Sequence, residues 1–182
     1  MSSATSQLLG LIVLLPLVGF LFNGVLATRL GGRRLNETVV NVVACALPAL
    51  SFVLTVVCFM QLEGGGQPLL EVTYTWATIG GQSFGIGFYF ARLSAVMTLV
   101  VTGVGTLIHV YSTGYMHGDE SHPRYFAYLN LFLFFMLLLV LGRSLLVMFV
   151  GWEGVGLASY LLIGFWFDDP AKAAAGKKAF VT

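Results

Sequence analysis

Long runs of apolar residues, separated by short polar stretches, dominate the chain. Five of these runs approach or exceed the roughly 20 residues that a helix needs to cross the hydrocarbon core of a membrane. The pattern therefore predicts five transmembrane helices in one membrane domain, residues 1–182. They cover approximately Leu8–Thr28, Val39–Met60, Arg92–Thr113, Tyr125–Gly142 and Leu145–Phe167.

The first two runs contain Pro16 and Pro48. Proline removes a helical hydrogen bond, and neighbouring helices can replace it in a membrane. We therefore expect two kinked but continuous helices. The first run follows polar residues without Lys or Arg, whereas a secretory signal carries a basic segment there, so we expect a retained helix.

The chain after the fifth run breaks and then becomes helical again. Asp168, Asp169 and Pro170 end the fifth span, and the stretch from Ala173 to Thr182 begins a sixth helix that stops abruptly. We expect the sequence to be the N-terminal fragment of a longer membrane protein.

The polar segment between the second and third runs has a different periodicity. Val72, Tyr74 and Trp76 alternate with threonines, and Phe84, Ile86 and Phe88 alternate after Gly80-Gly81. Alternation on both sides of a two-residue glycine turn predicts a β-hairpin. The hairpin is expected either to contact a neighbouring subunit or to lie on the surface, held by its aromatic residues.

Composition supports a membrane protein and excludes several other classes. Hydrophobic residues make up 58% of the chain and charged residues 9%, whereas soluble domains carry about 25% charged residues. The mean hydropathy is +0.90. A net charge of +1 with nine Lys and Arg residues argues against a nucleic-acid partner.

Cofactor chemistry is not expected within this chain. Cys45 and Cys58 would lie roughly 20 Å apart along one helix, too far for a disulfide, and an iron–sulfur cluster usually needs four ligands. The histidines lack the spacing of a metal site. The glycine-rich loops lack the context and the lysine of a phosphate-binding loop.

The distribution of basic residues predicts the orientation of the helices. Basic residues concentrate on the cytoplasmic side of membrane proteins. An outside N-terminus leaves two of them, Arg92 and Arg143, on the outer side. It places seven on the inner side: Arg29, Arg33, Arg34, Arg124, Lys172, Lys177 and Lys178. We therefore expect the N-terminus to face the periplasm.

Glu153 is the candidate functional residue. It is an acidic residue that the sequence places well inside a predicted transmembrane helix. It lies eight residues, roughly 12 Å, from the outer end of the fifth run. A carboxylate at that depth costs at least about 2.5 kcal/mol on insertion scales and usually has a function. Desolvation favours its neutral form, whereas a nearby buried lysine favours its ionised form. An acid balanced between these influences can relay protons; otherwise it is a neutral group that hydrogen-bonds a neighbouring helix.

The residues around Glu153 fit a packed and partly hydrated site. Gly154 and Ala158 form a small-xxx-small pair, which allows close approach of another helix. Ser159 and Tyr160 are candidate proton relays, with hydrogen bonding across helices as the alternative.

One of the three histidines, His109, is a further candidate for proton transfer. His109 lies near the inner end of the third span, and we weigh a relay role against a structural one. His117 and His122 are expected to be solvated loop residues, as are Asp119 and Glu120.

Three stretches of the sequence carry a resemblance to a known family. They are the stretches IHVYSTGYM and RYFAYLNLF, at 108–116 and 124–132, together with GWEGVGLASYLLIGFW at 151–166. The chain resembles the antiporter-like subunit L of bacterial NADH:quinone oxidoreductase, respiratory complex I. Similar patterns occur in the large subunits of Mrp-type sodium/proton antiporters.

The resemblance implies an all-α bundle of roughly 14 helices, of which this chain supplies the first ones. It implies that Glu153 pairs with a lysine on a later helix in a proton pathway. It also implies neighbouring complex I membrane subunits as partners, in the bacterial plasma (inner) membrane, with FMN, iron–sulfur clusters and quinone held by other subunits. A cation/proton antiporter subunit is the alternative, and a structural membrane subunit is a third interpretation.

Overall fold

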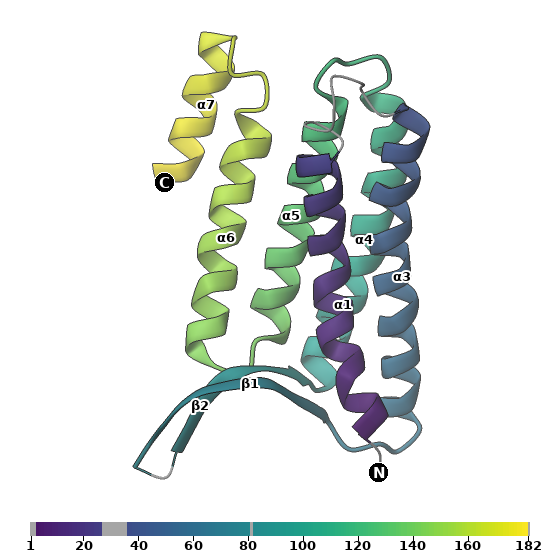
Figure 1. Cartoon of the computed structure of the whole chain (residues 1–182), viewed down its shortest axis with the longest axis vertical. Helices are drawn as coiled ribbons and strands as arrows, with labels where there is room; N and C mark the ends of the chain where they lie inside the picture. The colour runs from purple at the N-terminus through teal and green to yellow at the C-terminus, as the bar shows by residue number, and fades with distance from the viewer. Residues whose placement is uncertain (1–2, 27–35, 81, 182) are drawn as a thin grey trace.

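The computed structural model describes residues 3–26, 36–80 and 82–181 of the chain. Within these residues, five long helices stand side by side, a two-stranded hairpin crosses one end of the bundle, and a short helix lies beside the last long one (Figure 1). The helices are α1 (Ser3–Leu21) with its π-helical end η1 (Phe22–Leu26), α3 (Glu37–Glu63), α4 (Arg92–Tyr115), α5 (His122–Leu141), α6 (Leu145–Ile163) and α7 (Pro170–Val181). The strands are β1 (Leu69–Ile79) and β2 (Gln82–Phe90).

All five predicted spans are helices that are long and apolar enough to cross a membrane. Their ends differ from the predicted ones by a few residues, and Thr28 lies outside the described residues. α6 ends at Ile163, earlier than predicted, because Gly164 caps it and its N–H donates to the carbonyls of Tyr160 and Leu162. The predicted sixth helix begins at Pro170, as α7.

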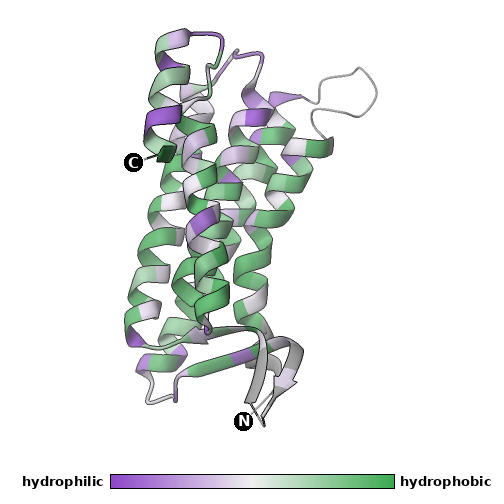
Figure 2. Ribbon diagram, turned by 90° about the vertical axis from the view of Figure 1, so that its left-hand side faces the viewer, coloured by the Kyte–Doolittle hydropathy of each residue, from purple (hydrophilic) through white to green (hydrophobic). Residues whose placement is uncertain are grey.

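α5 is the central helix of the bundle, because it packs against α1, α3, α4 and α6. Leu133, Leu137 and Leu141 of α5 meet Leu9 and Ile12 of α1 in the main hydrophobic core. Many large apolar side chains on the other helices remain exposed. Hydrophobic residues cover the middle of the helices, and hydrophilic ones gather toward the ends, as expected of helices that face lipid (Figure 2).

Both predicted prolines lie inside continuous helices, and a neighbouring helix compensates for one of them. Pro16 has no N–H to donate to the carbonyl of Ile12 one turn earlier. The hydroxyl of Ser51 in α3 donates to that carbonyl, at 3.0 Å. The hydrogen bond lost at the proline thereby becomes a contact between α1 and α3.

The predicted hairpin is confirmed. β1 and β2 are antiparallel, and the pairing of Ile79 with Gln82 leaves a two-residue turn at 80–81. β2 also pairs with the α5–α6 turn, where Phe88 bridges Gly142 and the N–H of Arg143 donates to the carbonyl of Gly87, at 3.0 Å. Arg143 itself is exposed at that end of the bundle.

Glu71 fastens the hairpin to α1. Its side chain is 8% exposed, and Oε2 accepts a hydrogen bond from the backbone N–H of Gly10, at 2.8 Å. A Cβ at position 10 would lie 2.5 Å from Oε1, so glycine is needed for the carboxylate to come this close to the helix. A charged acceptor makes this a strong hydrogen bond.

We predict that Glu71→Ala loosens the hairpin. A hydrogen bond to a charged group contributes about 1.5–3 kcal/mol, so amide exchange in β1 should accelerate at least about tenfold in hydrogen-exchange mass spectrometry. The exposed Glu63 at the end of α3 provides the control, Glu63→Ala, which should leave exchange in β1 unchanged. Equal exchange in both variants would show that the hydrogen bond between Glu71 and Gly10 does not stabilise the hairpin.

α6 packs closely on α5 through a seam of small residues. Gly151, Gly154 and Ala158 are buried, together with Val147, on the face of α6 that meets α5. A Cβ at position 154 would overlap the ring of Phe135. In a membrane, such close packing replaces the hydrophobic driving force between helices. The predicted small-xxx-small contact is therefore the α5–α6 seam.

We predict that Gly154→Ala destabilises the protein by about 1–3 kcal/mol, the usual cost of overpacking a tight contact. Gly156 is the matched control, since a Cβ there meets nothing within 4 Å among the described residues. Thermal unfolding in detergent should show a lower midpoint for Gly154→Ala than for Gly156→Ala. Equal midpoints would rule out a tight seam at Gly154.

Candidate functional site

Glu153 lies in the middle of α6. The helix begins after Ser144, whose side chain accepts a hydrogen bond from the N–H of Val147, at 3.3 Å. Glu153 follows Leu145 by eight residues, so it lies roughly 12 Å along a helix of 19 residues. Its place half-way along a spanning helix agrees with the prediction.

The side chain of Glu153 is exposed and points away from the α5–α6 seam. In an α-helix, residues seven apart lie on nearly the same line, so Glu153 shares a stripe of α6 with Tyr160. α7 covers the upper part of this side of α6: the ring of Phe180 lies 5.5 Å from that of Tyr160, and Gly176 packs against Gly164. Glu153 therefore lies on the side that faces α7, two turns below the contact with it.

The other candidate residues on α6 do not contact Glu153. Tyr160 is half-buried about 10 Å farther along the same stripe, and Ser159 is half-buried on a different side of the helix. No ion pair with Glu153 is found among the described residues. Within this part of the chain, the carboxyl lies half-way along α6, and no Lys, Arg or His side chain is within ion-pair distance of it.

His109 is buried within the bundle on α4, with 1% of its surface exposed. Its Nδ1 lies 2.7 Å from the carbonyl of Gly105, and because a carbonyl only accepts, Nδ1 carries the proton. Nε2 is buried without a hydrogen-bond partner among the described residues. The imidazole borders a cleft of about 260 Å³ between α4 and α5. α5 lies between His109 and the Glu153 stripe, so the two sites are separate.

His122 corrects an expectation. It was predicted to be a solvated loop residue, but it is the first residue of α5 and is 1% exposed. Its ring lies 4.9 Å from that of Phe126. Pro123 follows it, and proline favours the first turn of a helix; this signal could have moved the predicted start of the helix back to His122.

His117 is exposed, as predicted, and its Nδ1 lies 3.0 Å from a carboxylate oxygen of Glu37. Asp119, predicted to be solvated, is only half-exposed. Its side chain accepts hydrogen bonds from the N–H of Ser121, at 2.7 Å, and from the indole N–H of Trp166, at 3.4 Å. Asp119 therefore ties the α4–α5 loop to the α6–α7 turn.

The sequence analysis did not predict the buried side-chain amides of two asparagines. Asn130 of α5 donates to the carbonyl of Phe126, at 2.9 Å, and its Oδ1 faces Gly19 of α1. Both polar atoms of the Asn23 side chain are buried without a partner among the described residues. Asn23 lies in η1, and π-helical turns often occur at functional sites. The signal available was an uncharged polar residue inside a long apolar run.

Metal ligands do not cluster in this part of the chain. Among the described residues, no three His, Cys, Asp or Glu side chains lie close enough to hold a metal ion. Cys45 and Cys58 are free thiols on α3, and Cys58 is buried.

Two family models match the sequence. Residues 76–126 match the N-terminus of NADH-ubiquinone oxidoreductase (complex I) chain 5, and residues 142–182 match the transmembrane family of NADH:quinone oxidoreductase and Mrp antiporters. The structure resembles a chain of the membrane-bound sulfane sulfur reductase, an archaeal respiratory membrane complex. The TM-score is 0.80 at 20% identity, over 97% of this chain and 34% of that one, which shows a shared fold.

Individual relatives agree with the family models. The chain is 43% identical to NADH-quinone oxidoreductase subunit L of Escherichia coli K12 and 44% identical to that of Pseudomonas aeruginosa PAO1, in each case over 96% of this chain and 28% of the relative. It is 42% identical to NADH-ubiquinone oxidoreductase chain 5 of Allomyces macrogynus, over 86% of this chain and 24% of the relative. The chain thus spans about a quarter of the length of these relatives. It belongs to the subunit L and chain 5 family of NADH:quinone oxidoreductase and is a multi-pass membrane protein.

Proposed function

We propose that this chain forms part of a proton-translocating membrane subunit of NADH:quinone oxidoreductase, in which Glu153 carries protons. The observation that supports the proposal best is the position of Glu153, half-way along an apolar helix of spanning length. A carboxyl group at that depth is costly to insert and is a functional candidate by default. The relatives are named as subunits of NADH-quinone oxidoreductase, and we take the reaction of the complex from that name.

Glu153 works as a relay if its surroundings can change. Gly164 and Tyr160, on the same side of α6, are already covered by α7, and the helix direction carries α7 toward the level of Glu153. We propose that α7 and later helices of the full-length protein enclose the carboxyl and bring a lysine close to it. A nearby ammonium favours the ionised carboxylate, and its withdrawal favours protonation. Movement of that lysine would then load and unload Glu153.

Water has room to reach this stripe. Gly156 lies on the exposed side of α6, one turn from Glu153, and has no side chain to fill the space. Tyr160 offers a hydroxyl two turns from Glu153 along the same line. We propose that water carries the proton between Glu153 and Tyr160, with Ser159 in a supporting role at the edge of the path.

His109 is a second proton carrier in this proposal, on the other side of α5. Its Nε2 is an acceptor without a partner among the described residues, and an imidazole can both accept and donate a proton through its two ring nitrogens. The alternative is a packing role beside Phe126, whose ring lies 6.3 Å away.

The chain is proposed to lie in the bacterial plasma membrane with a periplasmic N-terminus. The hairpin end of the bundle would then face the periplasm, and the exposed Tyr74 of β1 would be available to a neighbouring antiporter-like subunit. FMN, iron–sulfur clusters and quinone are assigned to other subunits of the complex.

An Mrp-type cation/proton antiporter subunit is the second candidate. One observation favours it: the family model that matches residues 142–182 and includes Glu153 is shared with Mrp antiporters. Co-purification separates the candidates. FMN and iron–sulfur absorbance in complexes isolated through the full-length subunit supports the oxidoreductase, and their absence supports the antiporter.

We predict that Glu153→Gln lowers proton transfer through this subunit about tenfold or more, because positioned proton-transfer groups typically contribute at least about 10² in rate. The amide keeps the size of the side chain, so the full-length subunit should still assemble. Proton uptake by inverted vesicles, compared with NADH oxidation, measures the effect. Glu63→Gln makes the same chemical change at the exposed end of α3 and should pump normally. Normal pumping by Glu153→Gln would end the relay assignment.

We predict that His109→Gln also reduces pumping without loss of assembly, because glutamine can still donate to the carbonyl of Gly105 but cannot cycle a proton. His117→Gln, at an exposed histidine, is the matched control. The same vesicle assay decides between the two roles, since unchanged pumping in an assembled His109→Gln complex assigns the histidine to packing.

A further inference from the structure

Arg124 is held in place by the α6–α7 turn without an acidic partner. Its guanidinium carbon lies 4.8 Å from the ring centroid of Phe165 and 5.1 Å from that of Phe167. Nη2 donates one hydrogen bond to the carbonyl of Phe165, at 3.3 Å. Cation–π contacts fix the cation without using its N–H donors. Most of the five donors of this guanidinium therefore remain for a ligand.

Two acids of the adjoining loops, Asp119 and Asp169, are engaged elsewhere. Asp119 accepts hydrogen bonds from Trp166 and Ser121, and Asp169 lies 3.7 Å from the ammonium of Lys172. No carboxylate of the described chain lies within ion-pair distance of Arg124, and its Nε is buried without a partner there. A buried donor without an acceptor is costly, so an anion at this point would be stabilising.

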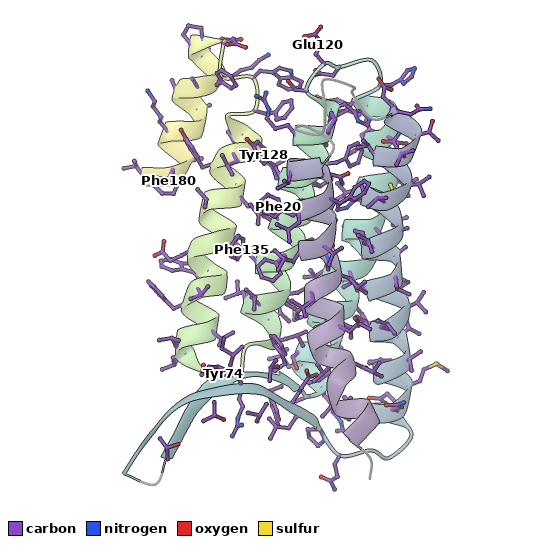
Figure 3. All side chains as sticks on the ribbon, viewed as in Figure 1. Phe20, Tyr74, Glu120, Tyr128, Phe135 and Phe180 are labelled. Carbon is purple, nitrogen blue, oxygen red and sulfur yellow. The ribbon has the colours of Figure 1, made fainter. Side chains whose placement is uncertain are left out.

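A pocket of about 190 Å³ lies next to this guanidinium. Tyr128, one turn farther along α5, and Tyr160 of α6 line it together with Gly164. Tyr128 lies between α5 and α6 (Figure 3). The hydroxyl of Tyr128 has no hydrogen bond within the described residues, so a fixed cation and a tyrosine with a free hydroxyl line one small cavity.

The depth of the pocket indicates the source of the anion. Arg124 is the third residue of α5, and Tyr160 lies in the last turn of α6, so both lie at the same end of the spanning helices. This is the depth of the polar headgroups, just outside the roughly 30 Å hydrocarbon core. Tyrosine is enriched at that level, and the arginine fork matches the oxygens of a phosphate group.

We propose that Arg124 and Tyr128 bind the phosphate of a phospholipid headgroup in this pocket, with Tyr160 forming part of its wall. The guanidinium supplies the charge and in-plane hydrogen bonds, and the hydroxyl of Tyr128 donates to a remaining phosphate oxygen. The bound lipid would fasten the start of α5 to the end of α6, at the end of the seam opposite to the hairpin.

The test uses the full-length subunit within its complex, purified in detergent and depleted of lipid. Phosphatidylglycerol is added back, and bound lipid is counted by native mass spectrometry across a concentration series. Arg124→Gln should weaken phosphatidylglycerol binding at this site about tenfold or more, the equivalent of about 1.4 kcal/mol. Arg143→Gln removes a cation from the opposite end of the same helix pair and should leave binding unchanged.

Tyr128→Phe keeps the fold and the ring contact with Phe165 but removes one hydroxyl. It should weaken binding by a few fold, and it decides the matter if Arg124→Gln does not assemble. Inorganic phosphate is the competing ligand: it should displace the lipid poorly. If a pocket variant that assembles binds the lipid as well as the wild type does, the proposal is wrong. It is also wrong if millimolar phosphate displaces the lipid.

Discussion

The structure depends on one constraint: a polar group inside hydrocarbon must find a partner within the protein. The proline of α1 shows it most directly, since the carbonyl that loses its helical donor receives one from Ser51. The threonine hydroxyls of α4 find their acceptors within the same helix. Each donates to the backbone carbonyl one turn earlier, as Thr102 does to Thr98, at 2.7 Å. Groups that remain without a described partner, such as Nε2 of His109, therefore mark the places where function is to be sought.

The same constraint explains why α6 can present an acid. Its small residues bury one face against α5, and this contact leaves the side that carries Glu153 free of α5. Bulky residues at the seam would have held the two helices farther apart. The face of α6 that packs on α5 and the side that carries the carboxyl are thus different sides of one helix, and α7 covers part of the second one.

Much of the fold follows from the sequence, because span length and strand alternation are local properties. The helices lie where the apolar runs predict them, and the two strands pair on either side of the predicted turn. The site is harder to predict, because burial of a polar residue depends on its tertiary neighbours. Nothing in the sequence distinguishes Glu71 from the other polar residues of the hairpin, and His122 was predicted to lie in a loop, yet both are buried. The position of Glu153 was predictable from counting residues; the side of α6 to which it points was not.

The pairing of β2 with the α5–α6 turn has a mechanical consequence. The backbone of Gly87 holds Arg143, which directly precedes the capping residue of α6. A displacement of the hairpin would therefore act on the first turn of α6, and a rigid helix would transmit it along its axis to the position of Glu153. The hairpin and Glu153 are thus connected through the hydrogen bond between Gly87 and Arg143 and the backbone of α6.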